Sequence, residues 1–215
     1  MHYGNNNQRA KYVMNGLELK ETVSERDLGV IFSADLKWRN HVTVCESRAN
    51  QMLGMLKRTF ASMDLKLLRT LYVTFVRPLI EFAAPVWSPS LKGDIDTIER
   101  IQHRETRMVK KLRKLQYYER LVRLGITSLE QRRKRGDLIQ VFKIFNIKEK
   151  IKLIQEPTLH KVLRGHDRYY RREIGRFGPR QEFLINRTAN NWNALRQSQS
   201  MQRQQTNSKD GLIKK

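Results

Sequence analysis

The residues of this 215-residue chain that could do chemistry are mostly cations, and the most ordered set follows a helical period. Arg100, Arg104, Arg107, Lys111 and Lys114 recur at alternating steps of four and three residues. Such steps return to one face of an α-helix, so a single helix would display all five along roughly 20 Å. Such a row could be only a solvated helix face, but on a rigid element it also suits contact with nucleic-acid phosphates, which requires no reading of bases.

A second group of cations, the run Arg132–Arg135, stands at the start of another predicted helix. Ser128 and Gln131 form a capping box there. Cations in the first turn oppose the helix dipole, so helix stability does not explain them. The run could contact phosphate, form a solvated face or act as a nuclear-targeting signal. The candidate nucleic-acid-binding residues are the five cations of the first group, their neighbour Lys110 and the three arginines of the run: Arg100, Arg104, Arg107, Lys110, Lys111, Lys114, Arg132, Arg133 and Arg135.

Other reactive residue types form weaker patterns. His41 and Cys45 stand four residues apart and could bind a metal or form a nucleophile with its base. No second pair at zinc spacing follows them, so packing in the core is the favoured interpretation. Trp87 lies in a Pro-flanked break and is open to two interpretations, a core residue or a platform for a base. We predict no catalytic residue and no metal site.

The charge of the whole chain favours a polyanionic partner. Its 43 Lys and Arg against 21 Asp and Glu give a net charge of +22. The excess is uneven, with net charges of +4 over residues 1–90, +9 over 91–150 and +9 over 151–215. Nucleic acid fits this charge first and an anionic membrane surface second.

The cysteine count, the length of the apolar runs and the N-terminal residues exclude or disfavour several classes of protein. The single cysteine, Cys45, rules out an internal disulfide framework. Apolar runs stay well short of the ~18 residues of a membrane span, and the N-terminal residues do not resemble a secretory signal. We therefore expect an intracellular protein of the nucleus or cytoplasm, with no membrane partner and no small-molecule substrate.

The elements that must position the cations are predicted to be mainly helical. Asn15-Gly16 predicts a β-hairpin, and residues 28–32 read as a buried strand. Pro78 is expected to kink or restart the helix that contains it. Apolar residues at helical spacing predict helices at about 36–60, 65–82, 94–115, 117–124, 129–145 and 183–195. The predicted fold class is mainly α, a helical bundle preceded by a small N-terminal β-hairpin and strand segment.

A series of short motifs runs in a fixed order along residues 1–196. They include Asp27-Leu28-Gly29-Val30, Val76-Arg77-Pro78-Leu79-Ile80-Glu81-Phe82-Ala83, Ile98-Glu99-Arg100-Ile101-Gln102, Ser128-Leu129-Glu130-Gln131-Arg132-Arg133 and Trp192-Asn193-Ala194-Leu195. In this order and spacing the chain resembles the C-terminal, thumb and post-thumb part of the jockey-like non-LTR (LINE-type) retrotransposon reverse transcriptases.

The resemblance implies an organisation into four segments. Residues 1–33 would be the end of a palm or primer-grip-like β segment, and residues 34–150 a helical thumb-like domain. Residues 151–196 would form a basic C-terminal region with a short Trp-containing helix, followed by a disordered polar tail at 197–215. Such a thumb implies binding of RNA, DNA or an RNA–DNA duplex through the phosphate backbone.

The same resemblance implies an RNA-directed DNA polymerase as the parent family, whose palm holds Mg²⁺ between Asp residues. This chain has no adjacent Asp pair, and Asp94 and Asp96 fall in a helical pattern. We therefore expect no catalysis by the chain on its own and no cofactor bound to it, with Mg²⁺ only in the missing palm. Two alternatives stay open: a stand-alone, non-enzymatic RNA- or DNA-binding module, and a non-functional translated transposon remnant.

Overall fold

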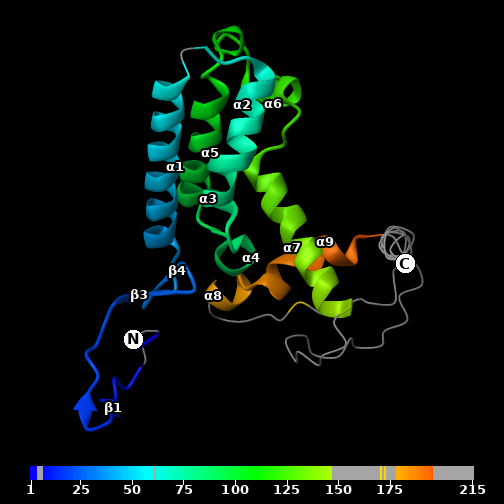
Figure 1. The fold of residues 1–215 in the computed structure, drawn as a ribbon. Coiled ribbons are helices and arrows are strands. Elements are labelled where there is room, and N and C mark those ends of the chain that lie inside the picture. Colours follow the sequence, from blue (N-terminus) through cyan, green and yellow to red (C-terminus); the bar gives the residue numbers. More distant parts are fainter. Residues whose placement is uncertain (4–6, 61, 147–169, 171, 173–177, 196–215) are drawn as a thin grey trace, which may run out of the picture. The chain divides into compact units, whose positions relative to one another are not determined.

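The structure, a computed structural model, describes residues 1–3, 7–60, 62–146, 170, 172 and 178–195 (Figure 1). The described chain is mainly helical, with two small antiparallel hairpins before the helices, which confirms the predicted fold class. It divides into two compact units, residues 1–133 and 134–215. Most of the predicted basic region at 151–196 and the whole tail at 197–215 lie outside the described residues.

The first hairpin confirms the prediction made from Asn15-Gly16. Strand β1 (Val13–Met14) pairs antiparallel with β2 (Leu17–Glu18). Asn15 and Gly16 have φ values of 53° and 80°, the left-handed pair that a type I′ turn requires. All four strand residues are exposed, including the large apolar side chains of Val13, Met14 and Leu17.

The second hairpin corrects the prediction of a single strand at 28–32. Leu28 and Gly29, with φ values of 45° and 90°, form a turn. That turn joins β3 (Ser24–Asp27) to its antiparallel partner β4 (Val30–Ser33). A Cβ on Gly29 would stand 3.0 Å from the ring of Phe82, so both the backbone and the packing favour glycine.

The helices of the first unit pack around a shared apolar core. They are α1 (Arg39–Thr59), α2 (Leu65–Leu71), the π-helix η1 (Tyr72–Val76), α3 (Arg77–Glu81), α4 (Ala84–Trp87), α5 (Lys92–Thr106), the 3₁₀-helix η2 (Lys110–Leu112), α6 (Tyr117–Leu124) and the start of α7 (Leu129–Asn146). Helix α1 packs against α3 and α5, and α6 packs against α2 and α5 (Figure 1). Val42, Ala49 and Ile98 are fully buried at this contact.

The interruption expected at Pro78 takes the form of a π-helix. Residues 65–81 are helical throughout, but Tyr72–Val76 adopts the wider π turn before α3 resumes. Pro78 has no N–H to donate to the turn before it, and a π turn is a common way to absorb such a defect. The prediction of a restart is confirmed.

The second unit is built from the rest of α7 with α8 (Gly178–Gln181) and α9 (Leu184–Asn193). Trp192 is 2% exposed and stacks on Phe145, with ring centroids 5.2 Å apart, so it is a core residue. Arg187 binds Asp137 through two hydrogen bonds of 2.9 Å each. A bidentate pair of this kind fixes α9 on α7 more firmly than apolar contact alone.

Candidate nucleic-acid interface

The cation stripe predicted for one helix is divided between two elements. Helix α5 ends at Thr106 with Arg107 as its C-cap, and the chain turns before η2 begins at Lys110. The single helix predicted at 94–115 is therefore wrong. Arg100 and Arg104 lie on α5, whereas Lys111 lies on η2.

Tertiary packing explains why the helix ends early. Val109 and Leu112 are buried in a second apolar cluster with Leu68 of α2 and Leu124 of α6. Val109 takes an extended conformation, with φ −77° and ψ 120°, and so turns the chain toward this cluster. Contact with residues distant in the sequence outweighs the local helical preference.

The cations remain exposed despite this division. They are Arg100, Arg104, Arg107, Lys110, Lys111 and Lys114. Arg104 donates a hydrogen bond to Asn50 of α1, and Arg100 donates one to Thr97, 2.7 Å away. Among the residues that the structure describes, none of these six cations makes an ion pair with a carboxylate. Their positive charge is therefore available to an external anion.

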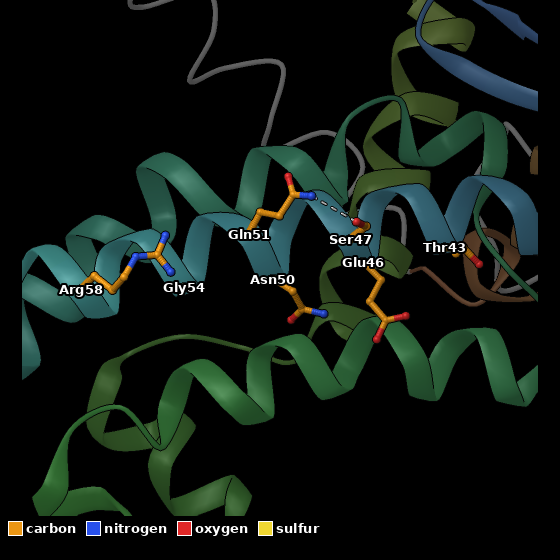
Figure 2. A pocket seen from close by; sticks show the side chains of 7 residues that line it. All are labelled: Thr43, Glu46, Ser47, Asn50, Gln51, Gly54 and Arg58. Atoms are coloured by element: carbon orange, nitrogen blue, oxygen red, sulfur yellow. Dashed lines mark hydrogen bonds between the residues drawn. The ribbon is translucent and has the colours of Figure 1, made fainter.

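A shallow hollow of about 590 Å³ runs along the exposed side of α1 (Figure 2). It is lined by Thr43, Glu46, Ser47, Asn50, Gln51, Gly54 and Arg58. Figure 2 shows Asn50 and Glu46 extending toward the neighbouring helix. One carboxylate and one guanidinium balance each other in this lining, so the hollow by itself has no preference for anions.

A second groove, which we call the basic groove, lies where the end of α1, the start of α2 and the turn around η2 meet. Its volume is about 800 Å³. Its lining residues are Lys57, Phe60, Ser62, Met63, Asp64, Leu65, Lys66, Met108, Val109, Lys110, Lys111 and Arg113. Lys57, Lys66 and Arg113 were missed by sequence reasoning because they belong to different elements, and no single helical period connects them.

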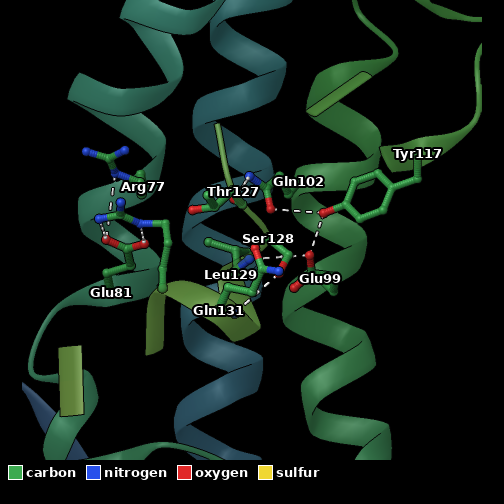
Figure 3. Close-up of polar contacts among 10 residues, drawn as sticks. Arg77, Glu81, Glu99, Gln102, Tyr117, Thr127, Ser128, Leu129 and Gln131 are labelled. Atoms are coloured by element: carbon green, nitrogen blue, oxygen red, sulfur yellow. Dashed lines mark hydrogen bonds and ion pairs between the residues drawn. The ribbon is translucent and has the colours of Figure 1, made fainter. Parts of the chain in front are cut away.

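The arginine run at the start of α7 has a structural role that its sequence did not reveal. Arg132 forms an ion pair with Glu81 of α3, with Nη2 and Oε2 2.9 Å apart. Glu81 also pairs with Arg77, as Figure 3 shows. Arg133 is only 6% exposed, whereas Arg135 is exposed. The inference that stability does not explain these cations is wrong for Arg132, because it links α7 to α3.

A polar network on the inner side of α5 holds the loop that leads into α7 (Figure 3). Buried Gln102 donates to the carbonyl of Thr127 at 3.0 Å, and the hydroxyl of Tyr117 donates to Glu99. Burial and this contact with Glu99 raise the pKa of Tyr117. Ser128 accepts a hydrogen bond from the backbone N–H of Gln131, which confirms the predicted helix start. These contacts hold the inner side of α5, the helix that carries Arg100 and Arg104.

Glu105 lies on the same inner side and is fully buried. Burial raises its pKa to about 8, and the nearby Arg120 lowers it only in part. Arg120 is itself 1% exposed, with its guanidinium 5.6 Å from the ring centroid of Tyr117. Within the described residues, neither carboxylate oxygen of Glu105 has a hydrogen-bond partner.

His41 and Cys45 occupy a core site. The imidazole Nδ1 accepts a hydrogen bond from the backbone N–H of Ile31 at 3.2 Å, and its Nε2 lies 3.4 Å from the Cys45 sulfur. Burial lowers the pKa of His41 and raises that of Cys45 to about 11. A neutral imidazole and a protonated thiol pack well and are poor nucleophiles. In the described ranges, no group of three metal-ligating side chains occurs.

The interpretation left open for Trp87 is resolved by its burial. Its side chain is fully buried, and its indole Nε1–H donates to the carbonyl of Phe82 at 2.6 Å. Its ring also contacts His41 edge-on, with centroids 4.5 Å apart. Trp87 therefore belongs to the core and cannot present a face to a base.

Comparison with family models, curated proteins and solved structures found no match to this chain. Across the part of the chain that the structure describes, no helix has both the length and the apolar composition needed to cross a membrane.

Proposed function

We propose that this chain is the thumb and post-thumb part of a LINE-type reverse transcriptase and binds template–primer nucleic acid by its phosphate backbone, without catalysis on its own. The observation that carries the proposal is the cluster of six exposed cations between Arg100 and Lys114, which make no ion pair in the described part of the chain. The ordered motifs along residues 1–196 support the family.

Backbone binding fits the way in which these cations are held. Each Lys or Arg that reaches a phosphate releases condensed counterions, which favours binding at any sequence. The inner side of α5 is fixed by Gln102 and Tyr117, so its cations stand on a rigid support. Contacts of this type set the position of a duplex without reading its bases.

The absence of catalysis is supported by the carboxylates of the chain. Nucleotidyl transfer needs carboxylates that hold two metal ions. The sequence has no adjacent Asp pair. Asp94 is 1% exposed and pairs with Arg39 at 2.6 Å, so it is already committed to an internal contact.

Fluorescence anisotropy with a labelled blunt RNA–DNA duplex tests the binding. Replacing Arg100, Arg104 and Arg107 together by Gln should weaken binding to duplexes of any sequence. It should also flatten the log–log salt dependence by about 0.9 for each phosphate that is no longer neutralised, the value for B-DNA. The control replaces Lys20, Arg48 and Lys92, which are exposed elsewhere, by Gln.

An equal change in slope for the two triple variants would contradict the assigned surface. Primer extension with purified protein, Mg²⁺ and dNTPs should give no product, and template-dependent synthesis would overturn the non-catalytic part of the proposal. A cooperative thermal transition of the protein would count against the transposon-remnant alternative.

A further inference from the structure

We propose that the basic groove binds an unpaired nucleotide of a single-stranded nucleic-acid segment that adjoins the bound duplex. The proposal rests on the proposed function, because the duplex brings the strand to the groove. It adds a second type of ligand contact, in which a base as well as phosphates is held.

The apolar residues of the groove lining are buried or partly buried and its cations are exposed, so the apolar residues form a floor that can accept the face of a base. Phe60, Met63, Leu65, Met108 and Val109 supply apolar side chains to its lining. Phe60 is only partly buried, at the point where α1 ends in an extended conformation with φ −109° and ψ 109°. Aromatic side chains bind bases by stacking without sequence preference. The volume of about 800 Å³ falls within the ~300–1,000 Å³ typical of ligand sites.

The rim of the groove matches an anionic chain. The lining contains one carboxylate, that of Asp64, and five cations: Lys57, Lys66, Lys110, Lys111 and Arg113. Asp64 is occupied, because its Oδ1 accepts from the backbone N–H of Leu67 at 2.7 Å and so caps α2.

The rim cations keep their charge available. Within the described ranges, the four lysines of the rim make no ion pair. Arg113 donates through Nε to the carbonyl of Arg107 at 3.1 Å, a contact with a neutral acceptor that leaves its charge uncompensated.

The combination of an apolar floor and a cationic rim distinguishes among anionic ligands. Within a duplex the bases are stacked on one another, so a duplex offers phosphates along its length and a free base face only at its two ends. An unpaired nucleotide offers both, with the base toward the floor and its flanking phosphates toward the lysines. An acidic peptide matches the rim alone, and we treat it as an outcome of the test.

The test compares a blunt RNA–DNA duplex with the same duplex carrying a short single-stranded overhang, by fluorescence anisotropy. The unmodified protein should bind the overhang duplex about fivefold or more tightly, the gain expected from stacking one base. Ser62→Glu places a carboxylate on the exposed rim and should remove this gain, whereas Ser62→Gln should retain it. Ser90→Glu, at an exposed position outside the groove, controls for the change of net charge and should also retain the gain.

A second measurement locates the base directly. An overhang that contains 4-thiouridine should crosslink to peptides carrying Phe60 or Met108. The proposal would be overturned by crosslinks confined to other peptides or by equal affinity for the two duplexes. It would also be overturned if Ser62→Glu and Ser90→Glu reduced the affinity equally. Polyglutamate and poly(dT) are then added as competitors. If polyglutamate abolishes the tighter binding of the overhang duplex and poly(dT) does not, the groove binds acidic peptides, and the proposal is also overturned.

The two proposals fail separately. Tight binding of both duplexes without an overhang gain removes the groove proposal and leaves the proposed function standing. Failure to bind either duplex overturns both.

Discussion

Arg104 of α5 donates a hydrogen bond to Asn50 of α1, with Nη1 and Oδ1 2.5 Å apart. The acceptor is a neutral amide, so Arg104 is held in place and keeps its full charge. A carboxylate at the same position would hold the guanidinium equally well but would neutralise it. This difference separates the structural contribution of Arg104 from the contribution to nucleic-acid binding that we propose for it.

Asn50→Asp is expected to weaken duplex binding severalfold and to lower the salt-dependence slope by about 0.9, the equivalent of one phosphate contact. The melting temperature should not fall, because the new pair keeps α1 linked to α5. Anisotropy titrations over a range of salt concentrations measure the first effect, and thermal unfolding measures the second. Gln51→Glu makes the same change of charge on an exposed neighbour and should have a clearly smaller effect on binding.

Glu105 should make stability depend on pH. Its pKa in the folded protein is about 8, against 4.5 for the free side chain, so between these values the folded state keeps a proton that the unfolded state releases. The free energy of unfolding should therefore fall as pH rises, by up to about 1.4 kcal/mol per pH unit from this residue. Urea titrations between pH 6 and 8 measure the slope. Glu105→Gln should remove this component of the slope, while Glu25→Gln on exposed β3 should leave it in place.

Arg132 and Arg135 should respond differently to replacement by Ala. Arg132→Ala removes the ion pair with partly buried Glu81 and should destabilise the protein by about 1–2 kcal/mol. Arg135 is exposed, and its replacement should change stability by less than about 0.5 kcal/mol. Urea unfolding distinguishes these outcomes, and equal destabilisation would contradict the structural role given to Arg132. Arg135→Ala should also weaken duplex binding, because Arg135 is an exposed candidate for phosphate contact.

The thiol of Cys45 should be unreactive in the native protein. A pKa of about 11 leaves little thiolate at pH 8, and the sulfur is buried beside His41. Labelling with a disulfide reagent should be slow in native buffer and fast in denaturant. Rapid labelling of the native protein at pH 8 would show that the core around α1 opens readily.

Features set by adjacent residues could be predicted from the sequence. The hairpin at Asn15-Gly16, the interruption near Pro78 and the helix start at Ser128 depend on the φ preference of a turn, on a missing N–H and on a side-chain cap. Each of these causes lies within a few residues of its effect. The inner face of α5 was likewise predictable, because Ile98 and Ile101 repeat at helical spacing and are buried.

Features set by contacts between distant segments could not be predicted in this way. Val109 packs in one apolar cluster with Leu68 of α2, which lies far earlier in the chain, and α5 ends because of this packing. The partner of Arg132 is Glu81, 51 residues away, and no local pattern indicates it. The basic groove draws its cations from three segments, so its charge becomes visible only when the chain is folded.

The exposed apolar side chains of hairpin β1–β2 have a consequence for the colloidal behaviour of the protein. Val13, Met14 and Leu17 are 61–73% exposed on a molecule whose net charge is +22. At low ionic strength mutual repulsion keeps copies apart. Salt shortens the range of that repulsion to about 8 Å near 0.15 M and lets apolar hairpins meet. We therefore expect the protein to self-associate through β1–β2 more readily as the ionic strength rises.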